Sequence, residues 1–287
     1  MAITINTNIA SIKAQRALNH TQMRLNNNLG RLSTGLRINT AADDAAGLAI
    51  SERLKSQIRS LSQAERNAQD GVSLLQVAEG AMNEVSGILT RMRELSVQSA
   101  TDTMGTTERG FLNQEINSLQ AELDRIANVT EFNGTKLLDG GATGTSFEFQ
   151  VGIGATSADR IATVIRGTKS VDLGVITGGT VSSVAGIDVT TQTGAVDSLA
   201  VIDQAISDIS ARRADIGASQ NRLNVTVANL GTARENLSAA NSRIRDVDVA
   251  AETAEMTRNN ILMQAGVSVL SQANQQPQVA LSLLGGG

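Results

Sequence analysis

Residues 202–244, IDQAISDISARRADIGASQNRLNVTVANLGTARENLSAANSRI, decide the fold. Aliphatic side chains recur through this stretch at steps of seven: Ile202, Ile209, Ile216, Leu223, Leu230, Leu237 and Ile244. Such a heptad repeat is typical of a helix packed along its length against other helices. A companion row starts with Leu199 and Ile206 but continues with Arg213 and Gln220. The stretch therefore predicts a helical seam in a bundle of several long helices and disfavours a two-stranded zipper.

Two further stretches have a helical pattern. From Asp43 to about Ala100, side chains again recur at steps of seven: Leu54, Leu61, Ala68, Leu75, Met82 and Leu89. Thr40 followed by Asp43 resembles a capping box at the start of this helix. A second helix is predicted from about Thr107 to Asn128, and Asn133-Gly134 follows it as a turn signal.

Between Gly140 and about Val196 the composition changes to Gly, Thr, Ser and Val. Phe147, Phe149, Val151 and Ile153 alternate with a period of two, which predicts strands in hairpins. The fold class expected is mainly α, with a long antiparallel helical bundle and a small β-hairpin insertion. Because both chain ends have the same character, antiparallel helices would allow them to pair.

The chain ends are unusually apolar and uncharged. No Asp, Glu, Lys, Arg or His occurs from Asn259 onward, and none precedes Lys13. Chain ends are usually polar, so these ends require cover by other protein. The predicted contacts in the core of a polymer are Ile5, Ile9, Ile12, Leu270, Val279, Leu281, Leu283 and Leu284.

Composition gives little support to an enzyme. The chain has no Cys, Trp or Tyr and only one histidine, His20. His20 lies in a polar helical stretch, where an exposed or interfacial role is favoured over catalysis. Asp43 and Asp44 fit a helix start better than a metal site. We therefore expect no catalytic residue, no cofactor and no metal, and we expect the chain to assemble.

Two other partner classes are also disfavoured. A net charge of −4 provides no basic surface for nucleic acid. No apolar run reaches the length of a membrane helix, and the sequence shows no secretory signal peptide.

Several long motifs resemble one family. INTNIASIKAQRALN at 5–19, RLSTGLRINTAADDAAGLAISERL at 31–54 and RMRELSVQSA at 91–100 resemble the N-terminal region of bacterial flagellins. EFNGTKLLDG at 131–140 resembles the segment leading into the family's β region. RIRDVDVAAETAEMTRNNILMQAGVSVLSQANQQPQVALSLL at 243–284 resembles the family's C-terminal region. The central segment is short, so large outer domains are expected to be missing.

The resemblance implies a function and a layout. It implies the structural subunit of the flagellar filament, a homopolymer outside the bacterial cell, exported without a cleaved signal peptide. A hook–filament junction protein is the alternative. Residues 1–40 plus 249–287 would form an inner terminal domain, 41–140 plus 196–248 a helical rod domain, and 141–195 a β-rich variable insertion. Implied partners are a flagellar export chaperone and the cap and hook-junction proteins.

The resemblance also implies recognition by animal hosts. A Toll-like receptor would bind a patch at Arg91, Leu95 and Glu115, and Thr90 departs from the glutamine common in the family. Intracellular sensing would use Leu281, Leu283 and Leu284. Packing between subunits is the alternative role of the Arg91 patch, because Arg91 and Leu95 are helical neighbours.

Overall fold

The computed structural model describes residues 7–176 and 181–284, and residues 277–284 by their backbone alone. The chain forms two compact units, residues 1–58 with 235–287 and residues 59–234. The divisions fall inside two long helices, α2 (Ala45–Ser99) and α4 (Gln192–Arg245). The mainly α fold with a small antiparallel hairpin confirms the expected fold class.

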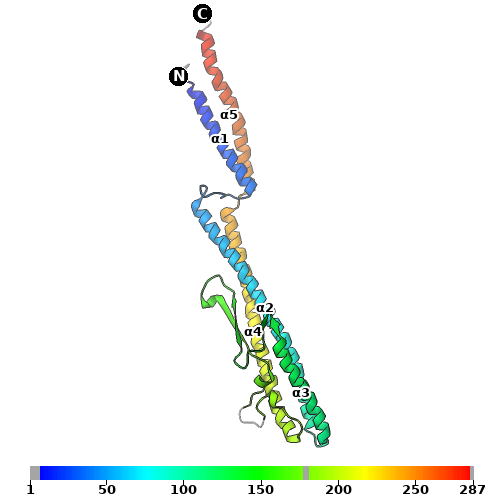
Figure 1. The fold of residues 1–287 in the computed structure, drawn as a ribbon. Helices are drawn as coiled ribbons and strands as arrows, with labels where there is room; N and C mark the ends of the chain where they lie inside the picture. The colour runs from blue at the N-terminus through cyan, green and yellow to red at the C-terminus, as the bar shows by residue number, and fades with distance from the viewer. Residues whose placement is uncertain (1–6, 177–180, 285–287) are drawn as a thin grey trace. The chain divides into compact units, whose positions relative to one another are not determined.

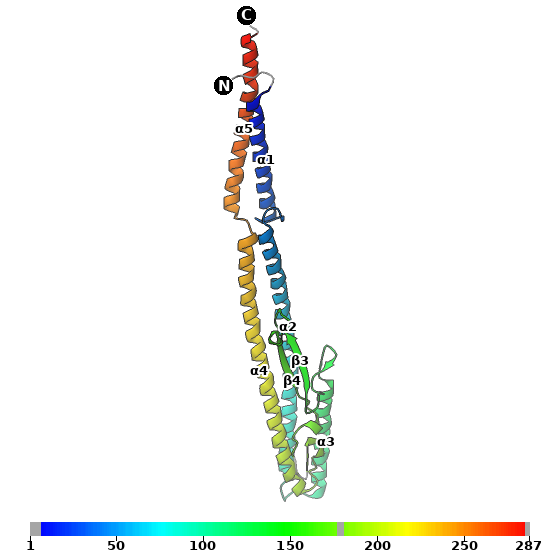
Figure 2. The ribbon, with the colours of Figure 1, turned by 90° about the vertical axis from the view of Figure 1, so that its left-hand side faces the viewer.

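In the first unit, two terminal helices pair lengthwise. Helix α1 (Ile9–Thr34) and helix α5 (Val249–Leu284) lie side by side and antiparallel (Figures 1 and 2). Asn8 caps α1 by accepting a hydrogen bond from the Ser11 N–H at 3.0 Å. The helix ends at Gly35, whose φ of 70° is the left-handed conformation that glycine adopts without strain.

The segments after α1 and before α5 hydrogen-bond to each other. Leu36 and Asp246 form an antiparallel bridge. The Arg37 N–H donates to the Arg245 carbonyl at 2.7 Å, and the Val247 N–H donates to the Gly35 carbonyl at 3.0 Å. These bonds join the segment that follows α1 to the segment that precedes α5.

Helix α2 begins later than the sequence predicted. Asp44, rather than Thr40, caps it by accepting from the Gly47 N–H at 2.8 Å. The Asp43 carboxylate instead accepts from the Asn39 N–H at 3.2 Å and from the Thr40 N–H at 2.9 Å. Asp43 therefore closes the loop before the helix and is not its first residue.

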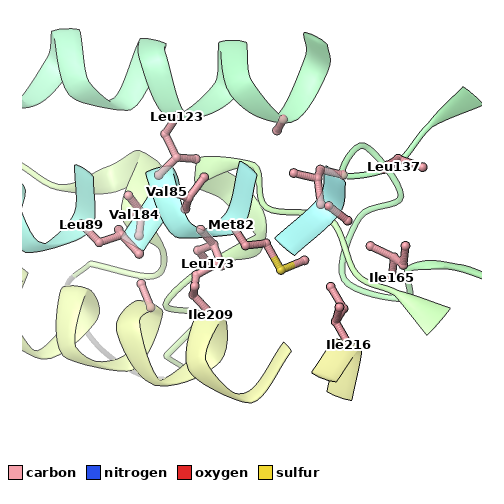
Figure 3. Close-up of a cluster of buried hydrophobic side chains, with 14 of the residues drawn as sticks. Met82, Val85, Leu89, Leu123, Leu137, Ile165, Leu173, Val184, Ile209 and Ile216 are labelled. Carbon is pink, nitrogen blue, oxygen red and sulfur yellow. The ribbon is translucent and has the colours of Figure 1, made fainter. Parts of the chain in front are cut away.

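In the second unit, α2 packs between α3 (Thr106–Val129) and α4 (Figure 3). Residues from all three helices bury their side chains in one core that includes Met82, Leu89, Leu123, Ile209 and Ile216. Of the row at steps of seven in α4, Ile202, Ile209, Ile216, Leu223 and Leu230 are buried, whereas Leu237 and Ile244 are half-buried. The heptad pattern thus lies along the packed side of α4.

The companion row in α4 differs from the one considered in the sequence. Ser198, Ala205 and Arg212 are buried, and they occupy the position three residues after the main row. The segment between α3 and α4 packs against this helix, and Arg212 donates hydrogen bonds to its Gly167 and Asp172 carbonyls. Arg213 and Gln220, one position further round, are half-buried.

Two short antiparallel hairpins follow α3. Strands β1 (Glu131–Phe132) and β2 (Thr135–Lys136) are joined by Asn133-Gly134, whose φ values of 49° and 77° give the turn that this dipeptide favours. Strands β3 (Thr145–Gln150) and β4 (Arg160–Ile165) pair with Phe147 opposite Thr163. Within the described residues, these are the strands of the chain.

The rest of the insertion is irregular and belongs to the core of the second unit. It contains short 3₁₀ turns, including η2 (Ser170–Asp172) and η3 (Val184–Gly186). Leu173, Val184 and Val189 are fully buried against the helices. Residues 141–195 therefore form less strand than expected, and they lie within the compact unit 59–234.

Candidate functional site

The contact between α1 and α5 follows a heptad pattern on both helices. Buried and half-buried side chains of α1 lie at steps of seven in two rows: Ser11, Leu18, Leu25 and Leu32, and Ala14, Thr21 and Asn28. Those of α5 are Glu252, Asn259, Gly266 and Ala273, and Met256, Met263 and Leu270. This is the seam of a two-stranded coiled coil. Among its large apolar side chains, Leu25 is the one that is buried within the described residues, and it remains 6% exposed.

Polar side chains make the most specific contacts across this seam. Near the start of α1, the Asn8 side chain donates to the Ala273 carbonyl at 2.8 Å, and the Ser11 hydroxyl donates to the Asn274 side chain at 2.8 Å. Gly266 permits close approach, because a Cβ built there would lie 3.1 Å from the Leu18 side chain.

A second polar layer lies near the other end of the pair. The Asn28 amide donates to the Glu252 carboxylate at 2.6 Å, and the Asn259 amide donates to the Asn28 oxygen at 3.1 Å. Arg31 extends this layer, since its guanidinium lies 3.9 Å from Glu252 and 3.9 Å from Asp43. Asn28 and Asn259 are both buried, and each has a hydrogen-bond partner.

The outward surface of the pair carries many large apolar side chains among its polar ones. Ile261 of α5 is 61% exposed and Ile9 of α1 is 53% exposed. Other exposed large apolar side chains on the two helices are Ile12, Met23, Leu29, Val249, Leu262, Val267 and Val269. Scattered apolar side chains are common on protein surfaces, but this many on one helix pair indicates a surface that contacts other protein.

The predicted terminal contacts have different positions. Ile9 and Ile12 lie exposed on α1, whereas Leu270 is half-buried on the side of α5 that faces α1. Ile5 lies outside the described residues. The backbone of α5 extends through the remaining four predicted contacts, whose side chains also lie outside the description: Val279, Leu281, Leu283 and Leu284.

The predicted patch around Arg91 is partly on the surface. The Arg91 guanidinium forms an ion pair with Glu115 of α3 at 2.9 Å and another with Glu94 at 3.0 Å. The hydrogen bonds that the guanidinium donates to Glu115 and Glu94 raise the pKa of Arg91. Leu95, however, is 1% exposed and lies in the core of the second unit. Arg91 and Glu115 are therefore available to a partner, and Leu95 supports the helix beneath them.

The described residues show no group of His, Asp and Glu side chains that could hold a metal ion. None of the described helices is both long enough and apolar enough to cross a membrane. Sequence reasoning missed the Asn28–Asn259 layer, although the two asparagines at seam positions among apolar residues were a signal that could have found it.

The fold and the site define a class of protein: a mainly α-helical protein whose paired terminal helices leave many large apolar side chains exposed. Comparison with known proteins gives the family. Residues 5–143 match the bacterial flagellin N-terminal helical region, and residues 199–284 match the bacterial flagellin C-terminal helical region. The chain belongs to the bacterial flagellin family.

Full-length relatives agree with this assignment. The chain is 48% identical to a flagellin of Halalkalibacterium halodurans, over 98% of this chain and 99% of that protein. It is 44% identical to a flagellin of Bacillus subtilis, over 98% of this chain and 99% of that protein.

A solved structure of a putative flagellar hook-associated protein from Vibrio parahaemolyticus is also similar. Its TM-score is 0.57 with 15% sequence identity, covering 71% of this chain and 100% of that one. At this identity the likeness shows the fold alone and does not favour the hook-junction alternative.

Proposed function

We propose that the chain is the structural subunit of a bacterial flagellar filament and that the α1–α5 pair is the main contact between subunits. The observation that carries this proposal is the outward apolar surface of the pair, which includes Ile9, Ile12 and Ile261. Membership of the flagellin family supports the same function. Burying these side chains would stabilise contacts between copies by about 25 cal/mol for each Å² of apolar surface removed from water.

Assembly follows from the geometry of such contacts. A contact between different surfaces of two identical subunits builds an open helical array when its rotation does not close into a ring. The absence of charge from Asn259 onward favours burial inside this array, because an unpaired charge in an interface would be costly. The inner terminal domain would comprise residues 1–40 and 249–287, with residues 41–140 and 196–248 as the rod domain and 141–195 as the insertion.

The terminal helices should gain most of their stability from neighbouring subunits. Most helical stability in proteins comes from tertiary packing rather than from helix propensity, and the described seam of the pair buries few large apolar side chains. Hydrogen exchange at residues 9–34 and 249–284 should be fast in the free chain and slow in the polymer. Slow exchange in the free chain would contradict this dependence on neighbours.

Seeded growth tests the proposal directly. Filament fragments should be extended by the unmodified chain but not by a chain lacking residues 279–287, which should still melt normally. Ile261→Asp should also block extension because it places a charge on the apolar surface. Ile261→Val is its matched control and should extend seeds. Extension by the Asp variant at an unchanged rate would show that this surface does not contact other subunits.

The remaining roles are inferred from the family. They comprise export without a cleaved signal peptide, location in the filament outside the cell, and contacts with a flagellar export chaperone and with the cap and hook-junction proteins. We propose no enzymatic activity, cofactor, nucleic-acid partner or membrane partner.

We also propose host recognition through a Toll-like receptor at Arg91 and Glu115, with intracellular sensing of the C-terminal leucines. The exposed ion pair between Arg91 and Glu115 supports a polar contact on this face. Arg91→Ala should reduce receptor signalling by the free chain, while Arg66→Ala, on an exposed part of the same helix, should not. Leu95 is left intact in this test because its removal would create a cavity in the core.

A further inference from the structure

Methionine supplies much of the apolar contact that α5 makes with α1. The row of α5 at steps of seven that faces α1 contains Met256, Met263 and Leu270, and each of these side chains is half-buried. The second α5 row in the seam is small or polar through its described side chains: Glu252, Asn259, Gly266 and Ala273. Two thioethers therefore carry a large share of the apolar packing that α5 contributes to the pair.

The methionines of the chain differ in their exposure. Met82 and Met92 are 0% exposed in the core of the second unit, whereas Met23 is 54% exposed on α1. Met256 and Met263 lie between these extremes. The seam that holds them buries few large apolar side chains, so we expect it to open in the free chain far more often than the core does. A small oxidant in solution should therefore reach the sulfurs of the seam and not those of the core.

Hydrogen peroxide converts a methionine thioether to a sulfoxide. A lone pair of the sulfur attacks one peroxide oxygen, and the O–O bond breaks. The hydroxide that leaves takes the proton from the transferred oxygen and becomes water. The sulfur has then given up an electron pair, the peroxide has been reduced, and the side chain has become polar. The sulfoxide oxygen accepts hydrogen bonds and donates none.

The seam offers this oxygen few free donors. Thr21 and Asn28 are polar seam residues of α1, but the Thr21 hydroxyl donates to the Ala17 carbonyl at 3.0 Å and the Asn28 amide donates to Glu252 at 2.6 Å. A sulfoxide inside the seam would compete with these bonds or stay unpaired, which is unfavourable for a buried acceptor. A sulfoxide turned outward would instead remove apolar contact from the pair. Both responses weaken the contact between α1 and α5.

We propose that Met256 and Met263 form a modification site for peroxide oxidants, and that their oxidation loosens α5 from α1 and stops the chain from extending the polymer. The inference rests on the proposed filament function. It adds a chemical sensitivity to the terminal helix pair, and this sensitivity is reversible because methionine sulfoxide can be reduced enzymatically.

Oxidation followed residue by residue tests the proposal. The folded free chain is treated with hydrogen peroxide, and peptide mass spectrometry measures the sulfoxide at each methionine. Met256 and Met263 should be oxidised well before Met82 and Met92. The oxidised chain should extend seeds about ten-fold more slowly, as a loss of about 1.4 kcal/mol of contact free energy would cause. Methionine sulfoxide reductases of both epimer specificities should restore extension. Oxidation of the seam methionines as slow as that of the core methionines would overturn the proposal.

Two double variants locate the effect. Met256→Leu with Met263→Leu conserves apolar volume, so it should extend seeds at the parental rate both before and after peroxide treatment. Met23→Leu with Met104→Leu removes as many thioethers elsewhere and should stay as sensitive as the parent. Loss of extension by the first variant after peroxide, or resistance of the second, would overturn the proposal.

Hydrogen exchange separates this inference from the proposed function. In Met23→Leu, the segment Ile9–Thr34 contains no methionine, so peroxide can change the exchange of α1 only through its partner α5. The protection of residues 9–34, relative to an unstructured chain, should fall after oxidation, and unchanged protection would overturn the inference. Failure of the untreated chain to extend seeds would instead count against the filament function. The exchange measurement on the free chain needs no polymer and would still decide the effect on the pair.

Discussion

The ring of Phe149 in β3 lies directly against the backbone of Gly71 in α2. A Cβ built at residue 71 would lie 2.9 Å from the ring, closer than side-chain carbons approach each other. The Asn67 side chain, one helical turn away, donates to the Gln150 carbonyl at 3.1 Å. The β3–β4 hairpin therefore packs against α2 at Gly71, where the helix has no side chain.

This contact predicts opposite effects at two glycines of the same helix. Gly71→Ala should destabilise the second unit by about 1–3 kcal/mol, because the ring must move to make room. Gly80→Ala should stabilise it by about 0.5–1 kcal/mol, because nothing lies within 4 Å of the added Cβ and alanine favours the helix. Thermal melts followed by circular dichroism would measure both changes. Equal shifts for the two variants would show that the hairpin is not held on Gly71.

Along α4, the loss of stability caused by an introduced charge should depend strongly on whether the position is buried. Leu223 is 0% exposed, whereas Val225, two residues later, is 62% exposed. Leu223→Asp should lower the free energy of unfolding by on the order of 4 kcal/mol, because it buries an unpaired charge. Val225→Asp should change it by less than about 0.5 kcal/mol. Denaturant unfolding of both variants is the measurement, and a melt of Leu223→Asp like that of the parent would place this residue on the surface.

The hydrogen bonds of Arg212 predict that this side chain holds the insertion against α4. Its guanidinium donates to the carbonyls of Gly167 and Asp172, while Asp124 of α3 accepts from the Ser170 N–H at 2.7 Å. Desolvation of the buried guanidinium lowers the pKa of Arg212. Arg212→Met should therefore release this segment, leaving each carbonyl unpaired at a cost of about 1–3 kcal/mol.

Limited proteolysis between residues 165 and 190 would measure this release. The variant should be cut faster than the parent. Arg222→Ala, which removes an exposed arginine from the same helix, should not change the rate. Equal rates for Arg212→Met and the parent would mean that apolar contacts alone hold the insertion.

The hydrogen bonds that Asp43 accepts predict that the loop before α2 becomes less stable in acid. Hydrogen bonds from the Thr40 N–H and hydroxyl, and then from the Asn39 N–H, lower the pKa of Asp43 below its ordinary value of 3.8. Because the folded pKa is the lower one, the stabilisation is complete above the ordinary value and is lost as the pH falls through the folded value. The protection of the Asn39 and Thr40 amides from hydrogen exchange, relative to an unstructured chain at the same pH, should therefore fall below about pH 4. Asp43→Asn should remove most of this pH dependence, and an unchanged acid response in that variant would assign it to another group.

Periodicity predicted much of this architecture because burial along a helix follows its turn. In α2, the row at steps of seven is buried from Leu61 to Leu89. In α4, the corresponding row is buried from Ile202 to Leu230. The sequence predicted that the helix begins at Asp43, whereas α2 begins at Ala45. Asp43 and Asp44 are equally suited to a helix start, and only the geometry of the loop distinguishes them. The family resemblance placed Leu95 in a surface patch, whereas the structure buries its side chain in the core of the second unit.

The insertion was the least predictable part. Its Gly, Thr and Ser content indicates turns and strands, but the burial of Leu173 and Val184 depends on helices distant in the sequence. No local pattern marks Arg212 as their anchor, because an arginine in a helix is usually exposed. A buried arginine beside alanine and serine at heptad spacing would be a useful sign of such a docked segment.

The pairing of α1 with α5 also determines when the chain can finish folding. The hydrogen bond from Asn8 to Ala273 joins residues 265 positions apart. Helix α1 is therefore synthesised first but has no partner until almost the whole chain exists, roughly 15–50 s later at ordinary translation rates. During that interval both of its sides are open to solvent and to other nascent chains. Of the two paired helices, α1 therefore waits the longer for the partner against which its seam packs.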